Sequence, residues 1–519
     1  MYLIQDIVIN HTANFYAYDG EYNPDDPAKN IYLLEEGHTG KIAPTQPPFD
    51  MIDPRVPEHR EADIYHWTPM LTDYEDPHQM NYYAFGYLAD INTENPTVVA
   101  AFKDSYGYWI NEVGVDGFRI DTVQYVNHPF WHHFLHDADG IYATAARTGR
   151  EHFLTFGETL VPSKPFEPDG EQRIAGYFGT EEQPALNSML GFPLYFTLRL
   201  VLSESQPAAQ LAYRLEQHMA QDPDPYVIPT FIDNHDTARF LSTGGQDAFE
   251  QALALIFTIP GLPIIYQGTE QMLPETRQSM FEGGWLAKPN TFDPQSDAYQ
   301  LIRNLAALRA GNAVFMRGDL EVLTGETTGP GLLVYKRTLG DDSALILMNT
   351  ADHAILVHAL DAGLAPGQVS KRILFGGDDV IADGTGHLNL TLPTRAVWVL
   401  QPGDGVVAVE PAPKSSVQFE QRPGDAILTS DFELAGTIDQ PGVELQLIIN
   451  GNLDNARTFT ADDSGHWQIT LPVRDLGETR SAVQIYAPAT NSLSERIEYR
   501  TRVSEPEIEV SVVDDPDDA

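Results

Sequence analysis

The stretch GVDGFRIDTV, residues 114–123, decides the fold of the chain. Gly114 ends a segment with helical spacing, residues 115–120 are predicted to form a short strand, and Asp121 follows that strand directly. Three other segments have the same form, a short apolar run that ends on polar residues: DIVINH (6–11), FGE (156–158) and FIDNHD (231–236). These four strand ends indicate a repeated structural unit.

Helical and strand patterns alternate through the first 310 residues. Helices are predicted at 95–113, 208–219, 248–257 and 298–308. Strands are predicted at 2–9, 115–120, 153–156, 193–202, 227–232 and 262–266. Repeated βα units imply a parallel sheet with right-handed crossovers, and in such folds the chemistry lies at the carboxyl ends of the strands. The fold class is therefore predicted to be α/β, a (β/α) barrel.

The composition changes after residue 310, where short strands replace helices. They are predicted at 332–337, 344–349, 373–375, 388–392 and 396–400. The expected organisation begins with a catalytic barrel at 1–310, which contains an inserted loop domain at about 12–87, and continues with an all-β domain at 311–402. A linker at 403–416 leads to an immunoglobulin-like β-sandwich at 417–503, in which Trp467 faces the core. An acidic disordered tail is expected at 504–519.

Charge and composition exclude several classes of function. The 519 residues include 75 acidic and 31 basic side chains, for a formal net charge of −44. Such a surface repels phosphate backbones and anionic lipids, so we expect no nucleic acid and no membrane partner. The excess acid fits either adaptation to salt or simple solubility. The chain has no cysteine, which excludes thiol chemistry, and it lacks an apolar run long enough for a transmembrane helix.

The carboxylates at the strand ends suit glycoside hydrolysis. That reaction needs one carboxylate that attacks the anomeric carbon and a second, protonated carboxyl group that protonates the leaving oxygen. Arg119 lies two residues before Asp121 on the same face of the strand, where its charge keeps Asp121 ionised. Glu158 follows the apolar Phe156 and Gly157, a setting that raises the pKa of a general acid.

Together, GVDGFRIDTV, FIDNHDTARF (231–240) and LADINTENP (88–96) resemble the α-amylase family of glycoside hydrolases over about residues 1–400, most closely its cyclodextrin glucanotransferase and maltogenic amylase branch. The resemblance implies that Asp121 is the nucleophile, Glu158 the acid/base, and Asp236 the carboxylate that stabilises the transition state. It also implies three substrate-binding residues: Arg119, His11 and His235. The implied substrate is an α-glucan polysaccharide or oligosaccharide.

The resemblance further implies a structural Ca²⁺ ion between the barrel and the long loop. Asn10 and Asp90 match its side-chain ligands, and oxygen ligands of this kind suit calcium. The backbone carbonyl of Tyr125 matches a further ligand position. Close relatives carry His where Tyr125 stands, and Gln124 replaces a Lys that is common in the family.

Three functions stay open at this point. The first is a retaining hydrolase of α-1,4-glucosidic bonds in starch or maltodextrin. The second is an α-glucan transglycosylase; Gly86 stands where cyclising relatives carry a bulky aromatic residue, although Phe85 and Tyr87 flank it. The third is a non-catalytic glucan-binding protein or inactive fragment. All three carboxylates are present, which favours an enzyme.

The DIVINH-type motif ends the third barrel strand in this family, whereas here it begins at residue 6. We therefore expect a (β/α)8 TIM barrel that lacks its first two βα units, and poor activity of this chain by itself. Residues 1–11 do not resemble a signal peptide. The family implies a secreted or periplasmic protein, and we expect a monomer.

Overall fold

The computed structural model describes residues 1–34, 43–221, 223–287, 289–409, 415–424, 427–477 and 480–500. The chain forms two compact units. Unit 1 comprises residues 1–199, 213–243 and 255–318, and unit 2 comprises 200–212, 244–254 and 319–519. Residues 504–519, expected to be an acidic tail, lie outside the described residues. None of the helices in the described ranges has the length and apolar character needed to cross a bilayer.

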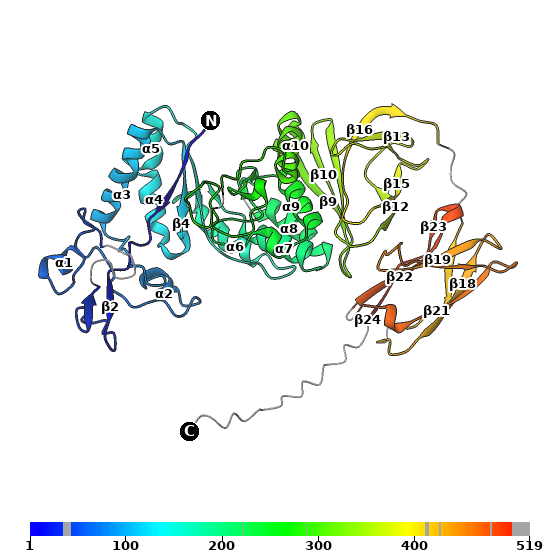
Figure 1. Ribbon diagram of the computed structural model, residues 1–519, viewed down its shortest axis with the longest axis horizontal. Coiled ribbons are helices and arrows are strands. Elements are labelled where there is room, and N and C mark those ends of the chain that lie inside the picture. Colours follow the sequence, from blue (N-terminus) through cyan, green and yellow to red (C-terminus); the bar gives the residue numbers. More distant parts are fainter. Residues whose placement is uncertain are drawn as a thin grey trace, which may run out of the picture. The chain divides into compact units, whose positions relative to one another are not determined.

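Unit 1 contains the parallel sheet that the alternating pattern predicted (Figure 1). Its four strands stand in the order β1 (Ile4–Val8), β4 (Gly117–Asp121), β5 (Leu154–Gly157) and β6 (Ser188–Met189). β7 (Pro229–Thr230) and β8 (Leu262–Pro263) form a second parallel pair. Val8 lies opposite Asp121 and Ile120 lies opposite Gly157, so these strands end at one edge of the sheet. That edge carries the segments that follow β1, β4 and β5.

Helices follow the strands, as the sequence indicated. α3 (Pro96–Tyr108) continues as a π-helical turn, η2 (Trp109–Val113), which confirms the helix predicted at 95–113. The Asn95 side chain caps α3 by accepting a hydrogen bond from the backbone N–H of Thr97, and Val98 and Phe102 are buried. The other long helices are α4 (His128–His136), α8 (Ala208–Gln221), α9 (Gln246–Thr258) and α10 (Asp297–Gly311), with the shorter α5 (Ile141–Arg147) and α6 (Asp169–Ala175) between them.

One predicted strand is wrong: residues 193–202 lie in a helix, α7 (Phe192–Ser203). The run reads PLYFTLRLVL, which is apolar almost throughout. Its buried side chains include Leu194, Tyr195, Leu198 and Leu202, spaced at the three to four residues of a helix. A short continuous apolar run does not distinguish a buried strand from a buried helix by periodicity, and here helical packing prevails.

The long segment between β1 and α3 contains short elements and an aromatic core. Its elements are β2 (Tyr16–Tyr18), β3 (Ile31–Leu33), α1 (Pro57–Ala62) and α2 (Pro77–Tyr82). Phe15 packs edge-on against Tyr65 at 5.1 Å between ring centroids, and Tyr65 lies 5.2 Å from Trp67. The backbone of the segment returns to the end of β1, where the N–H of Ile91 donates to the carbonyl of Asn10 at 2.9 Å. This pairing fixes the residues that follow β1.

Unit 2 is built mainly from antiparallel sheets. One sheet has six strands in the order β14 (Val380–Ile381), β13 (Gln368–Arg372), β16 (Val397–Val406), β11 (Asp342–Asn349), β10 (Leu332–Leu339) and β9 (Asp319–Gly325). β12 (Ile355–Asp361) pairs with β15 (His387–Leu392). The strand predicted at 373–375 is wrong, because β13 ends at Arg372 and Phe375 adopts a left-handed backbone with φ 60°. β16 continues to Val406, into the segment expected to be a linker.

The last part of unit 2 has its own core and two sheets. One contains β17 (Val417–Gln421), β18 (Phe432–Ile438) and β21 (His466–Leu471). The other contains β19 (Glu444–Ile449), β20 (Arg457–Thr460), β22 (Arg480–Ala487), β23 (Ser492–Leu493) and β24 (Ile497–Arg500). Trp467 is buried, with its ring 5.3 Å from Phe419 and 5.9 Å from Phe459, so the prediction that it faces the core is confirmed.

A short helix, α11 (Ala313–Arg317), lies where the sequence indicated no further helix. It is the last helical element of unit 1.

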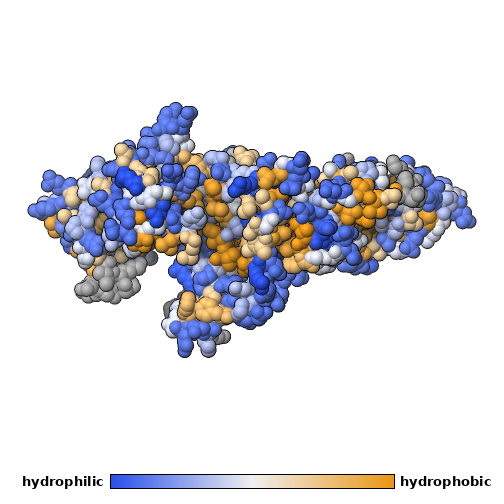
Figure 2. Space-filling model, turned by 90° about the horizontal axis from the view of Figure 1, so that it is seen from above, coloured by the Kyte–Doolittle hydropathy of each residue, from blue (hydrophilic) through white to orange (hydrophobic). Residues whose placement is uncertain are grey.

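Figure 2 shows that hydrophilic residues cover much of one face of the molecule, with groups of hydrophobic residues between them.

Candidate active site

A cavity of about 890 Å³ lies in unit 1, and residues that follow β1, β4 and β5 line it. Its lining includes His11, Asp121, Tyr125, Glu158 and Asp236, all of which the sequence singled out. The three carboxyl groups therefore face one cavity, as the strand-end pattern predicted.

Arg119 connects the carboxyl groups beneath the cavity. Its side chain is buried on β4, and its Nη1 lies 2.7 Å from Asp121 Oδ1 and 2.9 Å from Asp6 Oδ1. Its Nη2 lies 2.5 Å from Glu158 Oε2. Sequence reasoning paired Arg119 with Asp121 and missed the contacts to Asp6 and Glu158. A buried guanidinium shared by three carboxylates holds both candidate catalytic groups in fixed positions.

Glu158 carries the most informative electrostatic environment of the site. It is 7% exposed, and it follows β5 at a point where its backbone N–H donates to the carbonyl of Ile120 at 2.8 Å. Burial raises the pKa of Glu158, and the charge of Arg119 opposes this rise. The charges of Asp121 and Asp236, together with a hydrogen bond to Asp121, raise the pKa of Glu158 further. The net effect raises the pKa of Glu158 to about 7. A carboxyl group in this state can donate a proton near neutral pH.

Asp236 is held by His235 on the loop that follows β7 and by Arg277 on the loop that follows β8. His235 Nε2 lies 2.8 Å from Asp236 Oδ2, and Arg277 Nη2 donates to Asp236 Oδ1 at 2.6 Å. The hydrogen bond from His235 and the contact with Arg277 lower the pKa of Asp236, although burial opposes them. The same hydrogen bond raises the pKa of His235. Sequence reasoning missed Arg277, which also donates to the carbonyl of His235 at 2.8 Å.

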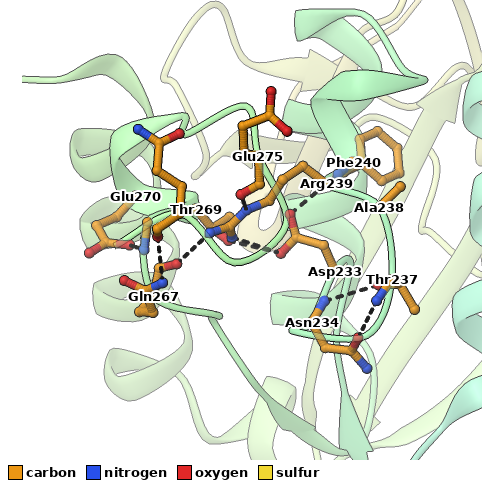
Figure 3. A network of polar contacts seen from close by, with 12 residues as sticks. Asp233, Asn234, Thr237, Ala238, Arg239, Phe240, Gln267, Thr269, Glu270 and Glu275 are labelled. Atoms are coloured by element: carbon orange, nitrogen blue, oxygen red, sulfur yellow. Dashed lines mark hydrogen bonds and ion pairs between the residues drawn. The ribbon is translucent and has the colours of Figure 1, made fainter. Parts of the chain in front are cut away.

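A buried polar network supports the loop that carries Arg277 (Figure 3). Arg239 Nη2 donates to the carbonyl of Gln267 at 2.7 Å, and its Nε donates to the carbonyl of Glu275 at 3.2 Å. Thr269 Oγ1 accepts a bond from Arg239 Nη1 at 3.1 Å and donates to Asp233 Oδ1 at 2.8 Å. The network joins the strand end that precedes Asp236 to the loop after β8. It therefore fixes both partners of the contact between Asp236 and Arg277.

Three ring-bearing residues, His11, Phe85 and Tyr125, also line the cavity. The ring of Phe85 is 4.5 Å from that of Tyr125 and 6.4 Å from that of His11. Burial lowers the pKa of His11, and the charge of Asp121 opposes this effect. A neutral imidazole can both donate and accept hydrogen bonds with hydroxyl groups. The cavity is therefore lined by one imidazole and two further aromatic rings.

Asn10 and Asp90, the predicted side-chain ligands of calcium, are both buried in neighbouring, paired segments. Asp90 Oδ2 lies 2.5 Å from His66 Nδ1, whereas Asp90 Oδ1 is buried and finds no hydrogen-bond partner among the described residues. Burial opposes a charged His66, but hydrogen bonds to Asp90 and Glu94 outweigh it and raise the pKa of His66 to about 9.

An unpartnered buried carboxylate oxygen fits a hard cation. Within the part of the chain that the structure describes, no group of three or more His, Cys, Asp or Glu side chains is arranged to hold a metal ion. The predicted calcium ligands contain only one such side chain, Asp90, beside the Asn10 amide and the Tyr125 carbonyl.

Comparison with known proteins agrees with this site. The profile of the family "Alpha amylase, catalytic domain" matches residues 1–303. A cyclomaltodextrin glucanotransferase of Geobacillus stearothermophilus is 30% identical in an alignment of 317 residues that covers 58% of this chain and 40% of that protein. An α-amylase of Streptomyces lividans is 26% identical in an alignment of 498 residues that covers 83% of this chain and 51% of that protein. The chain thus spans about half or less of the length of these relatives.

Solved structures show the same fold. A cyclomaltodextrin glucanotransferase with a three-domain ABC distribution has a TM-score of 0.58 at 24% identity, covering 79% of this chain and 76% of that one. An α-amylase of Geobacillus thermoleovorans in complex with acarbose has a TM-score of 0.57 at 23% identity, with 78% of each chain covered. The parallel strands of unit 1 and the antiparallel sheets of unit 2 fit the barrel and the C-terminal β-domains of these proteins. The chain belongs to the α-amylase family of catalytic domains.

Proposed function

We propose that this protein is a retaining glycoside hydrolase that cleaves α-1,4-glucosidic bonds of starch or maltodextrin. The observation that carries the proposal is that Asp121 and Glu158 line one cavity and contact the same guanidinium, with Arg119 Nη1 2.7 Å from Asp121 Oδ1 and Nη2 2.5 Å from Glu158 Oε2. Inverting enzymes hold their carboxyl groups about 6.5–9.5 Å apart to admit a water molecule, whereas retaining enzymes hold them about 5–5.5 Å apart. Two carboxyl groups bridged by one guanidinium suit the shorter spacing, which favours the retaining reaction.

In the first step, Asp121 attacks the anomeric carbon and forms a covalent ester with the sugar. The bond between that carbon and the glycosidic oxygen breaks, and Glu158 gives its proton to the leaving oxygen. In the second step, Glu158, now a carboxylate, takes a proton from water. The resulting hydroxyl attacks the same carbon and releases Asp121. The anomeric configuration is inverted twice and therefore retained.

The other residues of the site hold the sugar and the reacting groups. Arg119 keeps the Asp121 carboxylate aimed at the cavity through its 2.7 Å contact. Asp236, kept ionised by His235 and Arg277, offers carboxylate oxygens to sugar hydroxyl groups. His11, which also lines the cavity, offers an imidazole whose pKa is lowered by burial. These hydrogen bonds stabilise the transition state only if they strengthen as charge develops at the anomeric carbon.

We also propose that a structural calcium ion binds next to this site. The Asp90 carboxylate, the Asn10 amide oxygen and the backbone carbonyl of Tyr125 would hold it, and the unpartnered Asp90 Oδ1 supports that assignment. When bound, the ion would satisfy these oxygen ligands and tie the long segment to the end of β1. The ion takes no part in the proton transfers described above.

Phe85 favours transglycosylation as a second candidate function. The sequence resemblance places Gly86 at the position where cyclising relatives carry an aromatic residue. Gly86 adopts a left-handed backbone with φ 61°. Phe85 instead lines the cavity and packs 4.5 Å from Tyr125. An aromatic ring at this wall can hold an acceptor sugar in place of water. Chromatography of the products from maltotriose distinguishes the two functions, because transfer yields chains longer than the substrate.

The proposed function is tested by following the hydrolysis of soluble starch with ¹H NMR. We expect the α-anomer to appear first and mutarotation to follow. Asp121→Asn is expected to abolish turnover, whereas Asp116→Asn, a carboxylate near the amino end of the same strand where it contacts Arg150 at 3.1 Å, retains it. A β-anomer as first product, or full activity in Asp121→Asn, contradicts the proposal.

A further inference from the structure

We propose that unit 1 carries a second α-glucan-binding surface outside the cavity, formed by Phe281, Trp285 and Phe292 and called the aromatic patch below. The inference rests on the proposed function for the identity of its ligand. Phe281 is 66% exposed, Trp285 62% and Phe292 52%. None of the three is among the residues that line the 890 Å³ cavity. The patch is therefore separate from the candidate catalytic groups.

Exposure of three large aromatic side chains within twelve residues needs an explanation. Burying an aromatic ring removes about 150–250 Å² from water, which is among the largest favourable contributions a side chain makes. The rings of Phe281 and Phe292 lie 5.2 Å apart in an edge-to-face arrangement, so they support each other while remaining open to solvent. Grouped exposed rings of this kind mark ligand or partner sites, whereas single exposed apolar residues do not.

The backbone holds the aromatic patch in place before any ligand binds. Ser279 connects two of its residues, because its N–H donates to the carbonyl of Trp285 at 3.0 Å and its Oγ accepts from the N–H of Phe281 at 3.1 Å. Gly284 is required at its position, since a Cβ there would lie 2.3 Å from Ser279 Oγ. Leu286 has φ 52°, an unfavourable left-handed conformation for a leucine.

This preorganisation favours binding. Rings that already stand in fixed positions lose little conformational entropy when a ligand stacks on them. The strained backbone at Leu286 turns the chain directly after Trp285. The hydrogen bonds of Ser279 and the left-handed backbone at Leu286 therefore hold the rings at the surface.

The ligand that fits the aromatic patch is a neutral sugar polymer. The apolar C–H faces of a glucosyl ring stack on an aromatic ring while its hydroxyl groups stay in water, which suits half-exposed rings. A formal net charge of −44 disfavours polyanions and anionic lipids. The patch lies in the same loop as Arg277, which contacts Asp236 in the active site. A glucan chain held there is kept close to the cavity that cleaves it.

The test is binding to granular starch in a co-sedimentation assay, which needs no catalytic turnover. We expect Trp285→Ala to weaken binding about threefold to tenfold, and the double variant Phe281→Ala/Phe292→Ala to weaken it by a similar factor. Trp285→Phe keeps a ring and is expected to retain most of the binding. The matched control is Tyr108→Ala, because Tyr108 is 57% exposed elsewhere in unit 1.

Two results would overturn the inference: unchanged starch binding in Trp285→Ala, or an equal loss in Tyr108→Ala. If Trp285→Ala binds starch as the parent does but loses self-association, read by size-exclusion chromatography, the patch belongs to a contact with a second copy of the chain. Circular dichroism of each variant excludes misfolding. Starch binding that depends on Trp285 in a chain that hydrolyses no starch would support the patch and contradict the proposed function alone.

Discussion

Replacing Glu158 by glutamine should stabilise the protein at alkaline pH and leave its stability unchanged at acidic pH. The reason is the pKa of about 7, against 4.5 for an ordinary glutamate, which burial beside Asp121 produces. A carboxyl group with a raised pKa in the folded state contributes no penalty below pH 4.5. The penalty grows between pH 4.5 and about pH 7, where the unfolded chain loses this proton and the folded protein keeps it, and it levels off above pH 7, where the folded protein holds the buried charge.

The magnitude follows from the two pKa values. Each pH unit between them corresponds to about 1.4 kcal/mol, so the parent protein loses roughly 3 kcal/mol of unfolding free energy between pH 4.5 and pH 8 through this group. The glutamine side chain of the variant cannot ionise and avoids the loss. Since one kcal/mol shifts the midpoint of a domain larger than 150 residues by about 2 °C, the variant should melt about 6 °C above the parent at pH 8.

Thermal unfolding followed by near-ultraviolet circular dichroism at pH 4.5 and pH 8 measures this difference. The control is Glu151→Gln, because Glu151 is exposed just before β5 and its replacement should leave the parent's midpoint unchanged at both pH values. A Glu158→Gln variant that melts with the parent at pH 8, or below it, would refute the reasoning. The buried carboxylate would then be fully compensated by Arg119, and Glu158 would not be held as an acid.

Further predictions concern the acid, its arginine, the buried network and the calcium site. The value of kcat/KM on maltotriose should fall as the pH rises above about 7, where Glu158 loses its proton, and a profile flat to pH 9 would contradict its role. Arg119→Met should destabilise unit 1 by roughly 3–5 kcal/mol in urea unfolding and lower kcat at least about 100-fold, because it leaves Asp121 and Glu158 without their shared cation. Arg239→Lys should lower the urea midpoint, since a lysine cannot keep the planar contact with the Tyr266 ring at 4.2 Å together with the carbonyl bonds; an unchanged midpoint would argue against the network. A chelator should lower the melting temperature of the parent by several degrees and have no effect on Asp90→Ala, and equal shifts in both proteins would count against the calcium site.

The candidate catalytic groups could be predicted from the sequence because their signal is local. Each follows an apolar strand, and parallel strands that end at one edge bring Asp121 and Glu158 together without further information. The partners of those groups could not be predicted in the same way. Arg277 reaches Asp236 from another loop, and Phe85 reaches Tyr125 from the long segment, so both contacts depend on tertiary packing.

The two wrong strands have different physical causes. Residues 193–202 are apolar on nearly every face, and the buried interior around Leu198 accepts a helix as readily as a strand. At 373–375 the local preference for a strand is overridden by a turn, in which Phe375 takes a left-handed backbone and leaves its ring exposed. In both places the residue types are compatible with a strand. The structure that forms is selected by packing against residues that are distant in the sequence.

Trapping the sugar on Asp121 tests the retaining mechanism most directly. A fluorinated maltosyl fluoride has a leaving group that needs no acid, and Glu158→Gln lacks the base that would activate water, so the covalent ester should accumulate. After proteolysis, mass spectrometry is expected to find one maltosyl-derived adduct on the peptide that contains Asp121. No adduct should form in the double variant Asp121→Asn/Glu158→Gln. An adduct on another residue, or turnover to an inverted product without any adduct, would contradict the account.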